Sequence, residues 1–423
     1  YTLWSSPVVN QNLLAFSPNT IVTRFYEYLF TGTTTPTAYQ SVVPSTNSFA
    51  TAKGYMIRVA NTWSSVTPAA FNGQFTGVPN NGTLTYAVGQ GYNLLGNPYA
   101  SPISAYRFLI QNPKVETLYY WTHTVPASGG TYPQNNYASY TTLGGTASAA
   151  GGAIPNDKIQ VGQGFFIQAS NAHTVTFENE LRVDANTTSQ FFRNNETVVE
   201  NSDKHRIWLN LNDSSEKYNQ ILVGYMPNGT NGFDRLIDGK ALETSKTILY
   251  SLIDGNQEYV IQGKGNFSED DVVKLGLKVL MPSNFEISIE QFDGLFTNQE
   301  IYLKDNYTNA IHNLKNSAYY FLSQAGTFND RFELIYKKPS RQDELIDENS
   351  VLIYPTNGII KINSSVEKIN SITVYDILGK EVFTKTNINS NEFNISDIIT
   401  QNQSLIVKLT LVNGNQITKK IVF

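Results

Sequence analysis

Short runs of aromatic and β-branched residues, separated by glycine, asparagine and proline, recur along the whole chain. The chain holds 25 Tyr and 23 Phe but three Met. Aromatic and β-branched side chains fit the pleated, half-buried surface of a sheet, whereas Gly, Asn and Pro favour the turns between strands. The pattern predicts an all-β chain of tandem antiparallel β-sandwich modules, of the jelly-roll or immunoglobulin-like kind.

Charged residues are scarce and unevenly distributed along the 423 residues. They make up 15% of the chain, against about 25% in an average soluble domain. Residues 1–200 carry only 16 of them, so the composition changes near residue 200. We therefore predict one β-sandwich module over 1–200, a second over 201–338, a charged linker over 339–350 and a small terminal domain over 351–423.

Charge and missing residue types exclude several classes of protein. The net charge of −5 supplies no basic surface to neutralise phosphates, which argues against nucleic acid as a partner. Without cysteine there is neither a disulfide framework nor a thiolate metal site. No apolar stretch reaches the ~18 residues of a membrane-spanning helix. The first residues lack the features of a signal peptide, so we expect a mature or truncated piece of a longer precursor.

The sequence contains no pattern typical of a catalytic centre. The four histidines are His123, His173, His205 and His312. None has a second histidine at metal-ligand spacing, and neither a nucleophile elbow nor a nucleotide-binding loop is present. We expect no enzymatic activity and no cofactor, although a site assembled from scattered carboxylates stays open. Structural Ca²⁺ is a weaker alternative at Asp270-Asp271, Asp293-Gly294 and Asp305-Asn306, where turn-forming side chains are the more ordinary interpretation.

A run of aromatic residues supports a different function. Leu118-Tyr119-Tyr120-Trp121, with Trp4 and Trp63, offers rings that can stack on sugars, because Tyr and Trp combine an apolar face with a polar group. Aromatic residues in strands lie more often in a core. This alternative would make the chain the carbohydrate-binding region of a larger secreted polysaccharide-degrading enzyme, with surface glycans as ligands.

The end of the chain carries motifs in a specific order. Tyr354-Pro355 opens the terminal region, Tyr375-Asp376 is followed by Gly379-Lys380, and the chain finishes in Lys419-Lys420-Ile421-Val422 before the last residue. Each motif alone has a structural explanation, since Gly379 can supply a positive φ and Pro355 can stiffen an edge strand. Their order, spacing and terminal position make the combination specific.

With these motifs, residues 351–423 resemble the type A C-terminal sorting domain of proteins exported by the bacterial type IX secretion system. Asn357 stands where the family has a second proline, and Ser404-Leu405 where it has a Gly-Tyr step. The upstream regions are similar to segments that precede this domain in large surface proteins of gliding and pathogenic Bacteroidetes-type bacteria.

The resemblance implies a non-enzymatic, adhesin-type protein at the cell surface of a Gram-negative bacterium, reached through the periplasm and the outer membrane. Its partners would be an outer-membrane shuttle barrel of the PorV type and a giant translocon barrel of the SprA type. Many members also meet a sortase that attaches the cargo to lipopolysaccharide. The residues expected to form or support the sorting signal are Tyr354, Pro355, Tyr375, Asp376, Gly379, Lys380, Lys419, Lys420, Ile421 and Val422.

Overall fold

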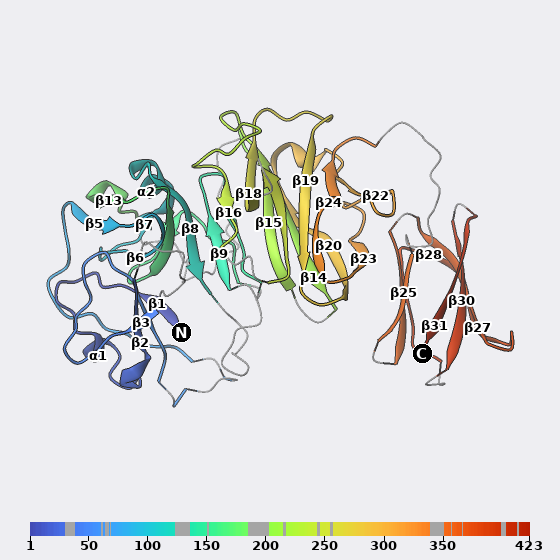
Figure 1. The fold of residues 1–423 in the computed structure, drawn as a ribbon, viewed down its shortest axis with the longest axis horizontal. Coiled ribbons are helices and arrows are strands. Elements are labelled where there is room, and N and C mark those ends of the chain that lie inside the picture. The colour runs from blue at the N-terminus through green and yellow to red at the C-terminus, as the bar shows by residue number, and fades with distance from the viewer. Residues whose placement is uncertain are drawn as a thin grey trace. The chain divides into compact units, whose positions relative to one another are not determined.

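The computed structural model confirms the predicted all-β fold class (Figure 1). It describes the chain apart from residues 30–38, 61, 64–66, 68, 123–135, 150–151, 185–202, 215–216, 243–245, 254–256, 339–350, 357, 366, 399–402 and 413. In the described part, the α-helices are short, and none is long and apolar enough to cross a membrane. Strands therefore provide nearly all of the regular structure.

The described residues divide into two compact units that alternate along the chain. Unit 1 comprises Tyr1–Lys204, Asn219–Ser245 and Ile253–Asn266. Unit 2 comprises His205–Tyr218, Lys246–Leu252 and Phe267–Phe423. The predicted modules over 1–200 and 201–338 stay predictions, and the predicted linker over 339–350 lies outside the described residues.

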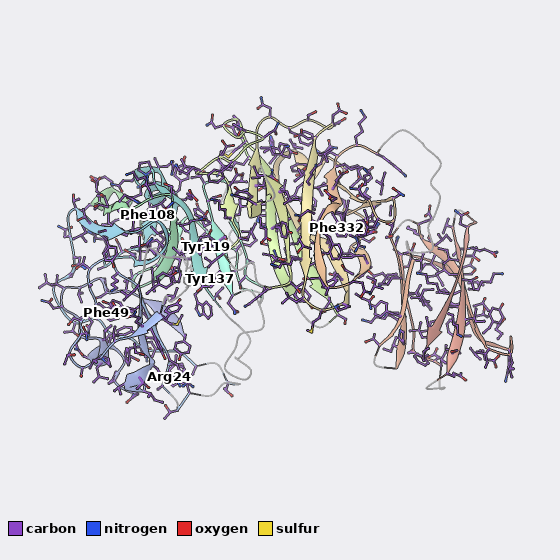
Figure 2. The ribbon with its side chains drawn as sticks, in the orientation of Figure 1. Arg24, Phe49, Phe108, Tyr119, Tyr137 and Phe332 are labelled. Atoms are coloured by element: carbon purple, nitrogen blue, oxygen red, sulfur yellow. The ribbon has the colours of Figure 1, made fainter. Side chains whose placement is uncertain are left out.

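Unit 1 begins with a small antiparallel sheet in the order β1-β4-β2-β3. Its strands are β1 (Thr2–Trp4), β2 (Phe25–Tyr28), β3 (Tyr39–Ser41) and β4 (Tyr55–Ile57), accompanied by α1 (Leu13–Phe16) and the 3₁₀ helix η1 (Val22–Arg24). An aromatic core forms beside it, where the rings of Phe16 and Phe49 meet edge to face at 5.4 Å. Phe49 is labelled in Figure 2.

A five-stranded antiparallel sheet in the order β10-β9-β8-β12-β6 carries the main core of unit 1. Its strands are β6 (Gly91–Gly96), β8 (Val115–Trp121), β9 (Tyr137–Tyr140), β10 (Gly145–Thr146) and β12 (Gly164–Ala169). Helix α2 (Ala105–Gln111) is capped by Ser104, whose Oγ accepts the Arg107 N–H at 3.0 Å. The helix buries Phe108, whose ring meets that of Phe165 at 5.5 Å. Elsewhere in unit 1, β5 (Leu84–Val88) pairs with β13 (His173–Phe177), β7 (Ile103–Ser104) pairs with β11 (Lys158–Ile159), and η2 (Asn179–Leu181) follows.

The later segments of unit 1 contain an exception to the antiparallel pattern. Strand β15 (Lys217–Tyr225), which belongs to unit 1 from Asn219 onward, pairs in parallel with β18 (Gln257–Lys264). The short strand β16 (Gly239–Lys240) pairs with β18 in the antiparallel sense. A parallel pair needs a long crossover, and the loop between β15 and β16 is part of it.

In unit 2, β20 (Ser283–Phe292) lies between β14 (His205–Asp213) and β23 (Tyr319–Ser323). A second group runs β22-β21-β24-β19-β17. Its members are β17 (Ile248–Ile253), β19 (Val272–Val279), β21 (Tyr302–Asp305), β22 (Ala310–Asn313) and β24 (Gly326–Ile335), and η3 (Gly294–Thr297) follows β20. Buried aromatic rings pack in this region, among them Phe332 (Figure 2) against Phe321 at 4.8 Å.

The last part of unit 2 is a small sandwich of two antiparallel sheets with a core of its own. One sheet is β25-β26-β29, from β25 (Val351–Thr356), β26 (Ile359–Ser364) and β29 (Glu392–Ile395). The other is β28-β27-β30-β31, from β27 (Ile369–Asp376), β28 (Glu381–Ser390), β30 (Ser404–Leu411) and β31 (Gln416–Val422). Ile372, Val374, Val407 and Leu409 are fully buried in its aliphatic core. Each such side chain stabilises the fold by about 1.5–3 kcal/mol. We call residues 351–423 the terminal domain.

Candidate docking surface on the terminal domain

The turn between β27 and β28 is held by the carboxylate of Asp376. The N–H groups of Leu378 and Lys380 donate to its Oδ1 at 2.8 and 2.9 Å. The Asp376 N–H donates to the Lys380 carbonyl at 2.9 Å, and the Gly379 N–H donates to the Asp376 carbonyl at 3.1 Å. Gly379 has φ of +81°, which favours glycine. These contacts explain why Asp and Gly occur at this spacing; Lys380 takes part through its backbone groups.

The same turn presents two large aliphatic side chains to solvent. Ile377 is 68% exposed and Leu378 is 89% exposed. Turn residues are usually polar or glycine, so adjacent exposed aliphatic residues at a well-ordered turn are unusual. We call Ile377 and Leu378 the apolar tip. The motif in the sequence pointed to Asp376, Gly379 and Lys380 but not to these two residues, although an Ile-Leu pair inside a turn motif was a visible signal.

Strand register places the end of the chain at the same end of the sheet as the apolar tip. Asp376 lies opposite Leu405, and Leu405 lies opposite Ile421. One residue further on, Val422 lies opposite Ser404 and is 67% exposed. Two predicted regions of the sorting signal, the central turn and the terminal strand, thus meet at one end of one sheet.

One face of this sheet is turned away from the core and carries three of the predicted residues. Tyr375 lies opposite Ile406, and Ile406 lies opposite Lys420, so the three side chains form one row across β27, β30 and β31. Lys420 is exposed and Tyr375 is half-buried. We call this surface the open face; its members are Thr373, Tyr375, Ile406, Lys408, Thr418, Lys420 and Val422.

The remaining predicted residues have structural roles or lie elsewhere. Ile421 is buried in the core of the terminal domain. The Lys419 Nζ donates to the Val351 carbonyl at 2.7 Å and so ties the last strand to the first strand of the domain. Tyr354 and Pro355 lie on β25, in the other sheet, and burial raises the pKa of the Tyr354 hydroxyl. The structure therefore does not bring all ten residues together.

The aromatic run proposed for sugar stacking lies mostly in the interior. Tyr119 and Tyr120 are buried on opposite faces of the five-stranded sheet, and Figure 2 shows Tyr119 within unit 1. The Trp121 Nε1 donates to the Tyr1 carbonyl at 2.9 Å. Trp4 packs edge to face on Phe16, with ring centres 5.1 Å apart. Tyr119 and Tyr120 thus belong to the interior, and Trp121 and Trp4 have contacts within unit 1.

The acidic residues considered as calcium ligands contact basic side chains. Asp293 accepts from Arg206 at 2.7 Å, and Asp270 accepts from Lys337 at 3.1 Å. Of the described residues, no three His, Asp or Glu side chains gather in a way that could hold a metal ion. His123 lies outside the described residues.

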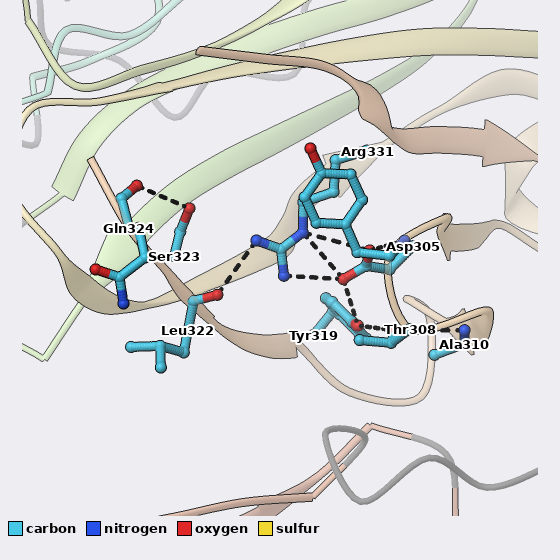
Figure 3. Close-up of polar contacts among 9 residues, drawn as sticks. Asp305, Thr308, Ala310, Tyr319, Leu322, Ser323, Gln324 and Arg331 are labelled. Atoms are coloured by element: carbon cyan, nitrogen blue, oxygen red, sulfur yellow. Dashed lines mark hydrogen bonds and ion pairs between the residues drawn. The ribbon is translucent and has the colours of Figure 1, made fainter. Parts of the chain in front are cut away.

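Asp305 forms the most buried ion pair among the described residues (Figure 3). The Arg331 Nη2 donates to Asp305 Oδ2 at 3.0 Å, and the Tyr319 hydroxyl donates to the same oxygen at 2.9 Å. Another guanidinium nitrogen, Nη1, donates to the Leu322 carbonyl at 3.2 Å. The Arg331 side chain is 6% exposed and the Asp305 side chain 0%. Burial of both charged side chains, together with their hydrogen bonds to neighbouring strands, indicates a structural role.

Unit 1 contains a second buried carboxylate, Asp238. Its Oδ1 accepts the Gly263 N–H at 2.7 Å, and its Oδ2 accepts the Asp234 N–H at 2.6 Å. Burial raises the pKa of this carboxyl to about 7, although both hydrogen bonds act in the opposite direction. The neighbouring carbonyl of Ile237 accepts from the Thr141 hydroxyl at 2.8 Å. Asp238 therefore anchors the loop between β15 and β16.

Replacing Asp376 by alanine should loosen the turn that carries the apolar tip. We expect a loss of about 1–2 kcal/mol in the stability of the terminal domain, because two N–H groups lose their acceptor. Hydrogen exchange should accelerate at Leu378 and Lys380. The exposed Asp397, which accepts from its neighbour Ser396 at 3.1 Å, supplies the matched control Asp397→Ala. Equal effects of the two substitutions would contradict this role of Asp376.

Comparison with known proteins places the chain in families without an assigned activity. No curated protein matches it. Residues 340–423 match the family described as Domain of unknown function (DUF8694). Residues 1–336 match the family described as Domain of unknown function (DUF8693), and this match covers most of the chain. The protein therefore belongs to the family described as Domain of unknown function (DUF8693).

Proposed function

We propose that this chain is a part of a non-enzymatic bacterial surface protein, and that its terminal domain directs export through the type IX secretion system. The shuttle barrel and the translocon would recognise this domain from the periplasm, and the upstream modules would be the adhesin-type cargo. The observation that carries the proposal is the rigid Asp376–Lys380 turn, which displays two exposed aliphatic side chains beside the end of the chain.

A signal read by a partner must be presented on a surface that folds independently of the cargo. The terminal domain is consistent with this requirement, because its two sheets enclose an aliphatic core whose buried residues lie between Val351 and Ile421. Its family match begins at residue 340, after the match of the preceding region has ended at 336. A separate module of this kind suits attachment to different cargo proteins.

The open face and the apolar tip are the parts of the domain most suited to contact a partner. Tyr375 and Lys420 combine an aromatic ring with a mobile positive charge, and Val422 adds an exposed aliphatic group at the same end. Aromatic anchors near a flat, partly apolar patch are common at protein interfaces. Lys419 and Ile421 would support this surface from within rather than contact the partner.

Export of the full chain from a type IX-competent bacterium tests the proposal. A signal peptide and a fluorescent reporter are placed before residue 1, and a second fusion ends at residue 338. We expect the complete fusion outside the cell, and the shortened fusion held in the periplasm. In cells that lack the shuttle barrel, both fusions should remain periplasmic.

Point substitutions locate the signal within the domain. Ile377→Ser combined with Leu378→Ser should reduce export at least tenfold, whereas Val412→Ser should not, although Val412 is 54% exposed at the opposite end of the same sheet. Export of the fusion that ends at 338, or export independent of the shuttle barrel, would refute the sorting function.

A further inference from the structure

The apolar tip has the geometry of a group that enters an apolar phase. Its two aliphatic side chains project from a turn in which four hydrogen bonds converge on Asp376 or Lys380, so the backbone is already ordered. Leu378 is 89% exposed, so the described residues of the domain leave most of its side chain uncovered. An ordered turn loses little conformational entropy when its side chains transfer out of water.

Exposed lysines lie next to the tip and on the open face. Lys380 follows it in sequence and is exposed, while Lys408 and Lys420 are exposed on the open face. Two acidic residues lie nearby: Asp376, whose carboxylate accepts the N–H groups of the turn, and Glu381, which lies opposite Tyr375. Residues 351–423 hold seven Lys against five Asp and Glu, whereas the whole chain carries a net charge of −5. The terminal domain thus has the opposite charge from the chain as a whole.

Tyr375 completes the arrangement. It lies two residues before Ile377 on the open face and is half-buried, in the row that leads to Lys420. Proteins at a lipid–water interface place residue types in the same order: apolar side chains deepest, an aromatic ring behind them, and lysines at the headgroups.

We propose that the apolar tip docks onto an anionic lipid surface, with Ile377 and Leu378 in the acyl region and Lys380 and Lys420 at the headgroups. The charge of the lysines selects anionic over zwitterionic lipid, and the two aliphatic side chains supply the apolar contact. This inference deepens the proposed function, because a shuttle barrel is surrounded by lipid, but the contact itself requires no barrel.

The lack of cysteine in the chain allows a site-specific test. Leu378→Cys and Val412→Cys in the full chain are each labelled with an environment-sensitive nitrobenzoxadiazole dye. The labelled proteins are mixed with vesicles of phosphatidylcholine alone or of phosphatidylcholine with phosphatidylglycerol. We expect the dye at position 378 to shift to shorter wavelength on the anionic vesicles only, and the dye at position 412 to remain in water.

Binding of unlabelled protein to the same vesicles, measured by co-sedimentation, tests each component. Ile377→Ser combined with Leu378→Ser should lower the affinity for anionic vesicles about 100-fold, because the loss of each aliphatic side chain should weaken binding about tenfold. Lys380→Gln with Lys420→Gln should lower it about 25-fold and reduce its sensitivity to salt. Val412→Ser is the matched apolar control, and Lys368→Gln is the control for exposed charge.

Three results would overturn the inference: equal dye responses at positions 378 and 412, binding that depends on the lysines without entry of the tip, and binding that appears only after a shuttle barrel is added to the vesicles. The outcome is independent of the export test. If the natural protein is exported normally but does not bind vesicles, only the lipid-docking proposal is refuted. If it binds vesicles but its export does not depend on the shuttle barrel, only the sorting proposal is refuted.

Discussion

Replacing Arg331 by methionine is expected to lower the free energy of unfolding of unit 2 by about 3–5 kcal/mol. The substitution leaves the Asp305 carboxylate buried with its charge uncompensated, because the guanidinium donates to both carboxylate oxygens at 3.0–3.3 Å. The Tyr319 hydroxyl and the Tyr307 N–H still donate to that carboxylate, at 2.9 Å each. Two neutral donors do not replace a cation in an interior that excludes water.

Hydrogen exchange during urea unfolding measures this effect within the full chain. Peptides from unit 2 should lose protection at lower urea, whereas peptides from unit 1 serve as an internal reference. The matched control is Lys304→Met, which breaks the Lys304–Glu333 pair on the neighbouring part of the same strands, β21 and β24. That pair is 3.0 Å long but 35% and 22% exposed, so its loss should cost at most about 1 kcal/mol. Equal losses would show that burial does not set the strength of the Arg331–Asp305 pair.

The second large effect concerns Asp238 and depends on pH. Its pKa is about 7 in the folded protein against 3.8 for an ordinary aspartate, so folding favours the protonated form. The stability that this group contributes is fully present below pH 3.8 and is lost as the pH rises to about 7. The difference amounts to about 4 kcal/mol, at 1.36 kcal/mol per pKa unit.

Asp238→Asn removes the titrating carboxyl group, so a comparison of the natural protein with this variant isolates its effect on stability. The stability of the natural protein minus that of the variant should fall by about 4 kcal/mol between pH 4 and pH 8. Carboxylates that do not interact with Asp238 cancel in the difference, whereas the neighbouring Asp234 interacts with it and contributes a smaller change. Peptides around Asp234 and Gly263 report the change by hydrogen exchange. A difference that does not vary with pH would show that Asp238 stays ionised in the folded protein.

Much of the strand pattern can be predicted from local sequence, and what cannot be predicted has a physical reason. Ile207, Leu209 and Leu211 alternate along β14 as residues of one strand face do, and all three are buried. Trp208 and Asn210, on the other face, are buried as well. Alternation shows which residues share a face, but it does not show whether distant segments cover both faces.

The candidate site shows the same division between local and distant information. The turn motif located Asp376, Gly379 and Lys380, because the hydrogen bonds and the positive φ that define this turn all lie within five consecutive residues. Lys419 contacts a carbonyl 68 residues earlier, so its structural role required the fold. Asp305 was considered as a metal ligand because its partner Arg331 stands 26 residues away and no local pattern connects them.

The alternation of the two units along the chain has a consequence for biosynthesis. Unit 1 includes Asn219–Ser245 and Ile253–Asn266, so the first 200 residues emerge from the ribosome long before their last structural neighbours. Until residue 266 has left the ribosomal exit tunnel, the early strands of unit 1 lack these neighbours and their apolar edges stay unprotected. The growing polypeptide is therefore a prime client for holding chaperones, and fragments cut near residue 200 should aggregate rather than fold.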